Sequence, residues 1–418
     1  MSSRYLFKLR NKTRHWKYDP LVLVSYAYRS LRALSKSSFN VIYLMPAILF
    51  RALDFRFLPF FTFRIGHLML EPDCYVKEMH LGLTPTRRPI VLAPKRSVAN
   101  HAAILYWKKY YTIVESPIAA AFLRPLSWHP LTMISTTRYA YNLAGTVAYP
   151  RIQALWKGKP PLLEINDRDK SRGEQCLERM GVPAGAWFVC IHSREGGYTQ
   201  STHNEDLSDY RNSRIENYLA AAEYVIAQGG FCFRMGDPTM VPIQEKQGLI
   251  DYAHRPERCD WLDLYLSARC RVFLGNTSGA FFMAAVFGAP VACANMVPMS
   301  GMYPFGANDI AITKLYRETS TGRLLPFEQI LEQPMGKFTM SIEFERQGID
   351  VVENSPEEIR DLLVEQLRKS TEPSFSYTEE EEFLQKRFRA LFRPGHHTYG
   401  SISRVGSAFL KKYQYLLP

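Results

Sequence analysis

Short apolar runs alternate with amphipathic stretches along most of the chain. In the first half, this alternation predicts strands over residues 57–63 and 89–93 and helices over 68–79 and 100–111, with Asn100 as a helix cap. In the second half, it predicts strands over residues 187–192, 231–235, 270–274 and 290–294, and helices over 166–180, 215–228 and 277–287. Strands that alternate with helices indicate right-handed crossovers and parallel sheets.

The same pattern divides the chain into four parts. Residues 55–160 and 161–370 each read as one α/β unit, preceded by a basic and apolar helical extension over 1–54 and followed by helices over 371–418. We expect two Rossmann-like domains that face a cleft, with ligands at the carboxyl ends of the strands. The tail contains a helix over 379–393, Glu-rich at its start and basic at its end, and an amphipathic helix over 402–417. These helices can pack back on the N-terminal domain.

Composition describes an ordinary globular chain with a basic arm at its start. The 418 residues are 46% hydrophobic and 22% charged, which excludes wholesale disorder. The net charge of +12 is unevenly placed, because residues 1–36 contain nine Lys or Arg side chains and one Asp. The remainder is mildly basic, which suits an anionic small molecule and disfavours nucleic-acid binding.

A membrane-spanning helix is not expected, because charged residues and prolines interrupt the apolar stretch over residues 41–63. Basic and apolar residues are nevertheless adjacent over residues 1–50, which favours contact with an anionic membrane surface. One alternative is a solvated basic arm that leads into a buried helix. Another is an organellar transit peptide, since the arm is rich in Arg and Ser and poor in acids.

Cysteine usage and acidic motifs give no sign of a metal site. The seven cysteines form no C-x-x-C pair and most lie in apolar runs, which indicates a reduced, cytosolic protein. A D-x-D motif at Asp167 and Asp169 falls at an apparent helix start, where capping explains it better than metal binding does.

The segment after the predicted strand at 270–274 has the features of a phosphate-binding turn. It reads Gly-Asn-Thr-Ser-Gly over residues 275–279, and small residues let a ligand approach the backbone. The start of the following helix and the hydroxyls of Thr277 and Ser278 can hold phosphate oxygens without a metal. The alternative is a capped, buried helix after a glycine turn. The segment matches neither the P-loop nor the dinucleotide-binding glycine pattern.

Cationic residues end two further predicted strands of the second half. His192 and Arg194 are two residues apart on one strand and therefore share a face, and Arg234 ends the next strand. The planar guanidinium suits a diphosphate, although ion pairs with Glu195 or Asp209 are the alternative. The predicted donor-binding residues are His192, Arg194, Arg211, Asn212, Arg234, Gly236, Asp237, Asn276, Thr277, Ser278 and Gly279.

Polar residues also follow the first predicted strand. Gly66 allows close approach of a ligand, and His67 can act as base or donor with Glu71 one helical turn further on, although a lone histidine is often structural. Asn100 and His101 can contribute a polar contact, or Asn100 can serve only as a cap. The predicted catalytic residues are His67, Glu71 and Arg194, and the predicted acceptor-binding residues are Gly66, His67, Asn100 and His101.

Several collinear motifs carry a resemblance to a known family. They include R-I-G-H at 64–67, V-C-I-H-S-R-E-G-G-Y at 189–198, Y-R-N at 210–212, F-R-M-G-D at 233–237 and F-L-G-N-T-S-G at 273–279. Over residues 55–300 the chain resembles a little-characterised bacterial family of GT-B glycosyltransferases. More distantly, the Gly-Asn-Thr-Ser-Gly stretch is similar to the donor-phosphate helix of heptosyltransferases, and His192-x-Arg194 resembles the strand-end arginine of bacterial fucosyltransferases.

The resemblance implies a metal-independent glycosyltransferase of GT-B architecture. It implies a nucleotide-sugar donor, a glycan or lipid-linked acceptor, and a cytoplasmic enzyme of surface polysaccharide biosynthesis, peripheral on the inner face of the cytoplasmic membrane, with no cofactor. Unlike heptosyltransferases, the chain has no obvious acid within the Gly66 turn, which leaves the base open between His67 and Glu71. The rival hypotheses are a sugar-nucleotide epimerase or hydrolase on the same frame, and a non-catalytic scaffold. Nucleotide, sugar, acceptor, linkage, anomeric outcome and oligomeric state stay open.

Overall fold

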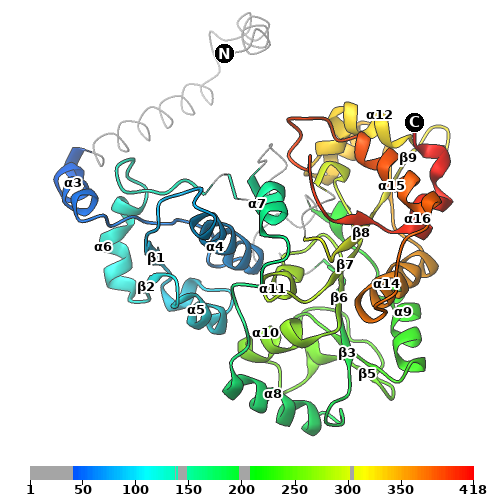
Figure 1. The fold of residues 1–418 in the computed structure, drawn as a ribbon, viewed down its shortest axis with the longest axis horizontal. Helices are drawn as coiled ribbons and strands as arrows, with labels where there is room; N and C mark the ends of the chain where they lie inside the picture. Colours follow the sequence, from blue (N-terminus) through cyan, green and yellow to red (C-terminus); the bar gives the residue numbers. More distant parts are fainter. Residues whose placement is uncertain (1–40, 137, 140–147, 197–207, 302–305) are drawn as a thin grey trace, which may run out of the picture.

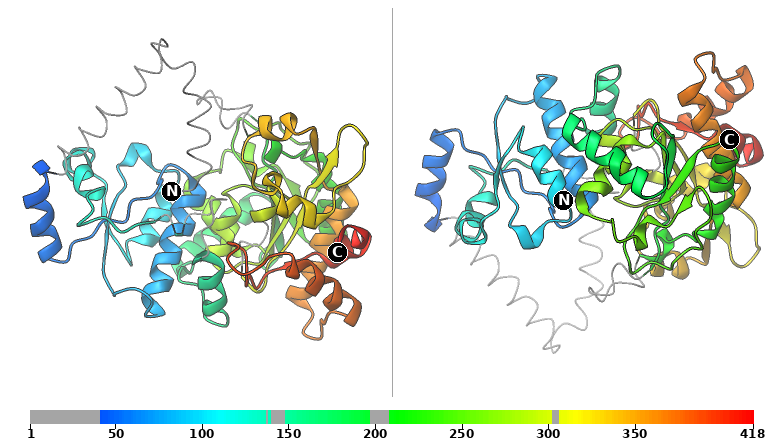
Figure 2. Two further views of the ribbon diagram at one scale, coloured as in Figure 1. Left: turned by 90° about the horizontal axis from the view of Figure 1, so that it is seen from above. Right: turned by 90° about the horizontal axis from the view of Figure 1, so that it is seen from below.

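The computed structural model describes residues 41–136, 138–139, 148–196, 208–301 and 306–418 (Figure 1). The basic arm over 1–36 and the end of the 189–198 motif lie outside the described residues. The described chain forms two α/β halves that lie side by side, as the views from above and below also show (Figure 2).

The second half is built on a seven-stranded sheet in which every pairing is parallel. Apolar, fully buried strands of this kind are expected where helices cover both faces. From one edge to the other the strands are β11 (Arg404–Val405), β8 (Ile310–Thr313), β7 (Val291–Met296), β6 (Val272–Gly275), β3 (Phe188–Ile191), β4 (Phe231–Arg234) and β5 (Leu249–Ile250). The predicted parallel sheet is confirmed.

Helices cover both faces of this sheet (Figure 1). α9 (Glu216–Ala227) and α14 (Pro356–Thr371) pack together on one face, and α10 (Asp260–Arg269) and α11 (Phe281–Val286) pack on the other beside α8 (Asp167–Arg179). The helix expected over residues 277–287 is shorter than predicted. α11 begins only at Phe281 and is six residues long, so a turn rather than a helix directly follows β6.

The first half carries a smaller sheet. β1 (Ile90–Leu92) and β2 (Thr112–Val114) pair in parallel, and Phe57 adds isolated bridges to Ile90 and Met133. The strand predicted over 57–63 is wrong beyond Phe57, because Pro59 has no N–H to donate and turns at Thr62 and Arg64 lead straight into the next helix. The helices are α3 (Leu44–Ala52), α4 (Ile65–His80), α5 (His101–Trp107), α6 (Pro117–Ser127) and α7 (Ala148–Trp156).

The C-terminal elements attach to the second half. An antiparallel pair, β9 (Leu315–Glu318) and β10 (Ile349–Val352), follows the sheet, with the helices α12 (Phe327–Glu332) and α13 (Ser341–Arg346) between its strands. The Glu-rich helix is confirmed as α15 (Glu379–Ala390). The helix predicted over 402–417 is wrong at its start, because β11 pairs with β8 there before α16 (Ser407–Lys412) begins. α16 packs on α14 and α15 rather than on the N-terminal half.

Packing between helices joins the halves. α4 packs against α11, and α5 packs against α10. One continuous buried apolar cluster runs through both halves, so the joint is part of the core.

Candidate active site

The order of the sheet defines one place for a ligand. The chain places β4 and β5 on one side of β3 and then returns to place β6, β7 and β8 on the other. In open parallel sheets, the crevice at the carboxyl ends of the strands where the order reverses is the usual ligand site. Here that point lies between β3 and β6, and it is where His192–Arg194 and the Asn276–Gly279 turn meet.

Asn276 connects the loops at this point of the sheet by hydrogen bonds. Its side chain is buried, and its Oδ1 accepts the Arg194 backbone N–H at 3.1 Å. Its Nδ2 donates to Ser213 Oγ at 2.7 Å and to the Arg211 carbonyl at 3.3 Å. Asn276, predicted to touch the donor, is therefore placed to position Arg194 and Arg211.

Three cationic side chains gather at the same edge of the sheet. Arg194 donates to the Ser208 carbonyl at 3.2 Å and to the Asn212 side chain, and burial with the Arg211 charge lowers its pKa to about 10. Lys314, which directly follows β8, donates to the Asn212 carbonyl at 2.6 Å. Burial lowers the pKa of Lys314 to about 8; the Glu353 carboxylate opposes this shift and the Arg194 charge adds to it.

These three cations have no carboxylate in salt-bridge contact among the described residues. The Arg211 Nε is buried there without a hydrogen-bond partner. Asp209, which begins the short helical turn that Arg211 ends, acts on Arg194 only at longer range. Like charges held together by partly buried side chains are stabilised by an anion, so we regard Arg194, Arg211 and Lys314 as the cation cluster of this site.

Lys314 was not predicted from the sequence. The signal that could have found it is the apolar run Ile310–Thr313 followed by a lysine, the same arrangement of strand and cation that singled out Arg194.

His192, which follows β3, and Ser278, which follows β6, form a polar pair in which His192 is buried and Ser278 is half-buried. Burial lowers the pKa of His192 to about 4, so its imidazole is neutral near pH 7. Its Nδ1 lies 3.1 Å from the Met235 carbonyl, which can only accept, so Nδ1 carries the proton. Its Nε2, 3.0 Å from Ser278 Oγ, then accepts the hydroxyl proton. The Ser278 hydroxyl proton is therefore held by His192, and Ser278 Oγ also accepts the Ala280 N–H at 3.3 Å. Donation from this hydroxyl to a phosphate, as predicted, would require the bond to His192 to break.

Arg234 is placed differently from its prediction. Its side chain is fully buried and pairs with Glu195 at 2.9 Å and with Asp251 at 3.2 Å, and it also donates to the Val241 carbonyl. The two carboxylates neutralise the guanidinium, which corresponds to the ion-pair alternative. A ligand would have to open these ion pairs to reach Arg234, so we leave it out of the cation cluster.

Other predicted donor-binding residues make hydrogen bonds within the loops of the second half. Thr277 Oγ1 accepts the Val297 N–H at 2.9 Å and so anchors the turn to the end of β7. The Gly236 carbonyl accepts a bond from Arg258 at 2.8 Å, and Asp237 accepts the Thr239 N–H at 2.9 Å. Gly279, at the end of the 276–279 turn, lies against Gly66 of the first half.

The first half contributes the start of α4. Gly66 abuts Gly279 so closely that a Cβ on Gly66 would lie 2.9 Å from the Gly279 Cα. The next residue, His67, is half-buried, and its Nδ1 lies 2.5 Å from Glu71 Oε1. Burial raises the pKa of Glu71, and its bond to His67 opposes the shift. A carboxylate at Nδ1 favours the tautomer in which Nε2 is free to accept a proton.

Asn100 and His101 lie at another contact between the halves. Asn100 caps α5 by accepting the Ala103 N–H at 2.9 Å, and its Nδ2 donates to the Asp260 carbonyl at 2.7 Å, which confirms the cap. The His101 N–H donates to Asp260 Oδ2 at 2.7 Å. A cavity of about 370 Å³ opens at the carboxyl ends of β1 and β2, and it is lined by Ala93, Lys95, Val98, His101, Ile104, Leu105 and Glu115.

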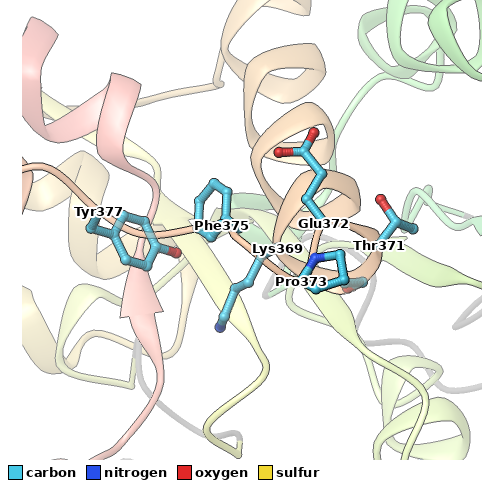
Figure 3. A pocket seen from close by; sticks show the side chains of 7 residues that line it. Lys369, Thr371, Glu372, Pro373, Phe375 and Tyr377 are labelled. Atoms are coloured by element: carbon cyan, nitrogen blue, oxygen red, sulfur yellow. The ribbon is translucent and has the colours of Figure 1, made fainter.

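A second cavity of about 370 Å³ lies at the end of α14, between Lys369 and Tyr377 (Figure 3). The Lys369 ammonium donates to the Ala307 carbonyl at 2.9 Å, just before β8 begins. This cavity is therefore at the amino ends of the strands, on the opposite edge of the sheet from the cation cluster.

The described residues contain no group of three or more His, Cys, Asp or Glu side chains that could hold a metal ion. The D-x-D motif starts α8, where Asn166 accepts the Asp169 N–H at 2.9 Å, and Asp169 accepts the Tyr106 hydroxyl at 2.7 Å. The capping interpretation of this motif is confirmed. All seven cysteines are unpaired.

No model of a known protein family matches the chain, and neither does any curated protein. Three solved structures are similar to it at low sequence identity. A glycosyl transferase of family 9 from Veillonella parvula DSM 2008 is 16% identical over 72% of this chain and 78% of its own, with a TM-score of 0.38. The ADP-heptose LPS heptosyltransferase II of E. coli is 14% identical over 75% of this chain and 98% of its own, with a TM-score of 0.41. The glycotransferase of kitacinnamycin is 12% identical over 87% of this chain and 98% of its own, with a TM-score of 0.27.

Proposed function

We propose that the chain is a metal-independent glycosyltransferase that moves a sugar from a nucleotide-sugar to a glycan or lipid-linked acceptor. The observation that carries the proposal is the cation cluster of Arg194, Arg211 and Lys314 at the topological switch point of the sheet. A departing nucleoside diphosphate develops negative charge, and preorganised cations in a partly buried crevice stabilise that charge.

The His67–Glu71 pair supplies the second requirement of the reaction. The acceptor hydroxyl must lose a proton as its oxygen bonds to the sugar carbon, while the bond from that carbon to the diphosphate breaks. His67 Nε2 takes the proton, and Glu71 holds the Nδ1–H and stabilises the imidazolium that forms. The leaving diphosphate carries away the electron pair and remains against the cation cluster.

Contact between α4 and the 276–279 turn relates the two parts of the site. Gly66 touches Gly279, Ser278 lies one residue before Gly279 and is bonded to His192, and Arg194 follows two residues after His192. The acceptor therefore enters from the side of α4, and the donor phosphates lie on the side of β3. The resemblance of residues 55–300 to bacterial GT-B glycosyltransferases implies surface polysaccharide biosynthesis as the pathway and the cytoplasmic face of the membrane as the place, and we include both in the proposal.

The experiment is a thermal-shift screen of the full-length protein with nucleoside diphosphates and their sugars. We expect at least one of them to stabilise the protein, by about 2.7 kcal/mol at a hundred times its Kd. Arg194→Ala removes the shift and lowers turnover by about a hundredfold or more, with the ligand-free melting temperature retained. Arg317→Ala, which breaks an exposed ion pair with Asp350, is the matched control and keeps the shift.

The other outcomes of the screen separate the rival functions. Failure to bind any nucleotide would favour the non-catalytic scaffold. A protein that consumes the donor at full rate without an acceptor is a hydrolase or an epimerase. An unchanged shift in Arg194→Ala places the ligand outside the cation cluster and overturns the proposed site.

A further inference from the structure

The helix α3 is apolar and almost entirely unburied. It reads Leu-Met-Pro-Ala-Ile-Leu-Phe-Arg-Ala, and Ala47 is its one buried residue. Met45, Ile48 and Leu49 are all exposed, with Met45 at 74% of its full accessible area. In a helix of a globular protein the large apolar residues are normally buried, so α3 departs from the usual pattern.

The helix α6 repeats this arrangement beside it. Ile118 and Phe122 lie one turn apart and are 73% and 72% exposed, whereas Leu126 points into the protein. Leu126 shares a small buried cluster with Ala47 of α3, so both helices pack on the same end of the first half. Figures 1 and 2 show that this end lies away from the second half.

Charge on these helices is sparse and of one sign. Each helix has one charged residue, Arg51 in the last turn of α3 and Arg124 in the last turn of α6, and neither has an acid. The chain segment that precedes α3, residues 1–36, has nine basic residues and one acid. An apolar surface on a chain whose preceding sequence has an excess of cations is complementary to the acyl region and headgroups of an anionic bilayer.

We infer that the exposed residues of α3 and α6 (Met45, Ile48, Leu49, Ile118 and Phe122, together the α3–α6 face) dock on the surface of a bilayer that contains anionic lipid. The face inserts shallowly, at the level of the headgroups. No helix among the described residues is long and apolar enough to cross a membrane. The inference is independent of the reaction proposed above, because it concerns a surface that contains none of the site residues.

Vesicle flotation with the full-length protein tests the inference. We expect the protein to float with vesicles of phosphatidylcholine and phosphatidylglycerol and to bind pure phosphatidylcholine more weakly. Replacing two apolar side chains by carboxylates, in Ile118→Glu/Phe122→Glu, lowers the partition coefficient by at least about tenfold. Phe383→Glu on α15, where Phe383 is a comparably exposed aromatic residue of the second half, is the matched control and floats like the wild type.

Each contrary result overturns the inference in a defined way. Flotation of Ile118→Glu/Phe122→Glu at the wild-type level shows that the face does not dock. Equal binding to neutral and anionic vesicles at low and high salt removes the role of the basic residues. A dimer of the wild type that the double variant abolishes, without vesicle binding by either, assigns the face to a second copy of the chain. The ligand-free melting temperature of the double variant reports its folding, and the thermal shift that a nucleotide produces in it reports its active site.

Discussion

Gly66 and Gly279 bring the backbones of the two halves into direct contact. A Cβ on Gly279 would lie 2.7 Å from the Gly66 nitrogen, and a Cβ on Gly66 would lie 2.9 Å from the Gly279 Cα. Neither distance is possible for a real side chain without movement of one backbone. The contact sets the start of α4, and with it His67, against the turn that contains Ser278.

Gly279→Ala is therefore expected to push α4 away from the 276–279 turn. Overpacking against backbone lowers the free energy of unfolding by about 1–3 kcal/mol, and the shift of His67 reduces turnover further. Chemical denaturation and steady-state kinetics measure the two effects. Gly306→Ala is the control, because its Cβ would meet Asp309 at an ordinary 3.6 Å and its stability should stay unchanged. Wild-type stability of Gly279→Ala would show that the joint is not tightly packed.

Arg234 is expected to be a stability residue. Arg234→Met leaves the Glu195 and Asp251 carboxylates without their common counter-ion, and breaking a buried pair from one side costs about 3–5 kcal/mol. Urea denaturation measures this loss. The exposed pair of Arg317 with Asp350 gives the contrast, since Arg317→Ala should cost under about 1 kcal/mol. If Arg234→Met kept its stability but lost nucleotide binding, the original prediction of a donor contact would be right.

The sequence predicted the central strands of the second half well. β3, β4 and β6 are apolar runs that end at or directly before a polar or glycine residue, so local pattern marks them clearly. β7 extends two residues beyond its predicted end, through Asn295 to Met296. β5 and β11 have two residues each, and they exist because neighbouring strands pair with them across the sheet. A tertiary contact of that kind leaves no periodic pattern in so short a segment.

Only part of the candidate site was predicted, because tertiary contacts that leave no local sequence pattern also decide which side chains meet. Strand-end position identifies Arg194, but it does not show whether a cation meets a ligand or a carboxylate. Arg234 meets Asp251, 17 residues away in sequence, and only the packing of β4 beside β5 brings the two together. Lys314 was missed because β8 itself was not predicted. The proximity of Gly66 to Gly279 depends on both halves and could not be read from either motif alone.

Lys314 gives nucleotide binding a pH dependence. Its pKa is lowered to about 8, so the side chain is cationic below pH 8 and neutral above it, and an anionic ligand favours the cationic form. Affinity for the nucleoside diphosphate should therefore fall as the pH rises through about 8, by about tenfold in total. Isothermal titration calorimetry between pH 6.5 and about pH 9.5 measures this dependence.

Two substitutions assign that pH dependence to Lys314. Lys314→Met binds weakly at every pH and shows a flat profile, whereas Lys314→Arg keeps its charge and retains affinity at high pH. Lys246→Met, which removes an exposed partner of Glu223, leaves the wild-type profile in place. A wild-type profile in Lys314→Met would assign the titration to another group and remove Lys314 from the cation cluster.

His67 is expected to act in the chemical step and not in donor binding. His67→Ala lowers turnover by about 10²–10⁴-fold, because the acceptor hydroxyl then loses its general base. The thermal shift produced by the nucleoside diphosphate stays at the wild-type value, since the cation cluster is intact.

Glu71→Gln still accepts the Nδ1–H of His67 but no longer stabilises an imidazolium, so its turnover falls less than that of His67→Ala. His254, whose Nδ1 lies 2.8 Å from Asp251, is a histidine–carboxylate pair of the same kind in the second half, and His254→Ala should leave turnover unchanged. The assay uses the donor found by the screen and a glycolipid acceptor fraction. Equal turnover of His67→Ala and the wild type in this assay would exclude His67 as the base.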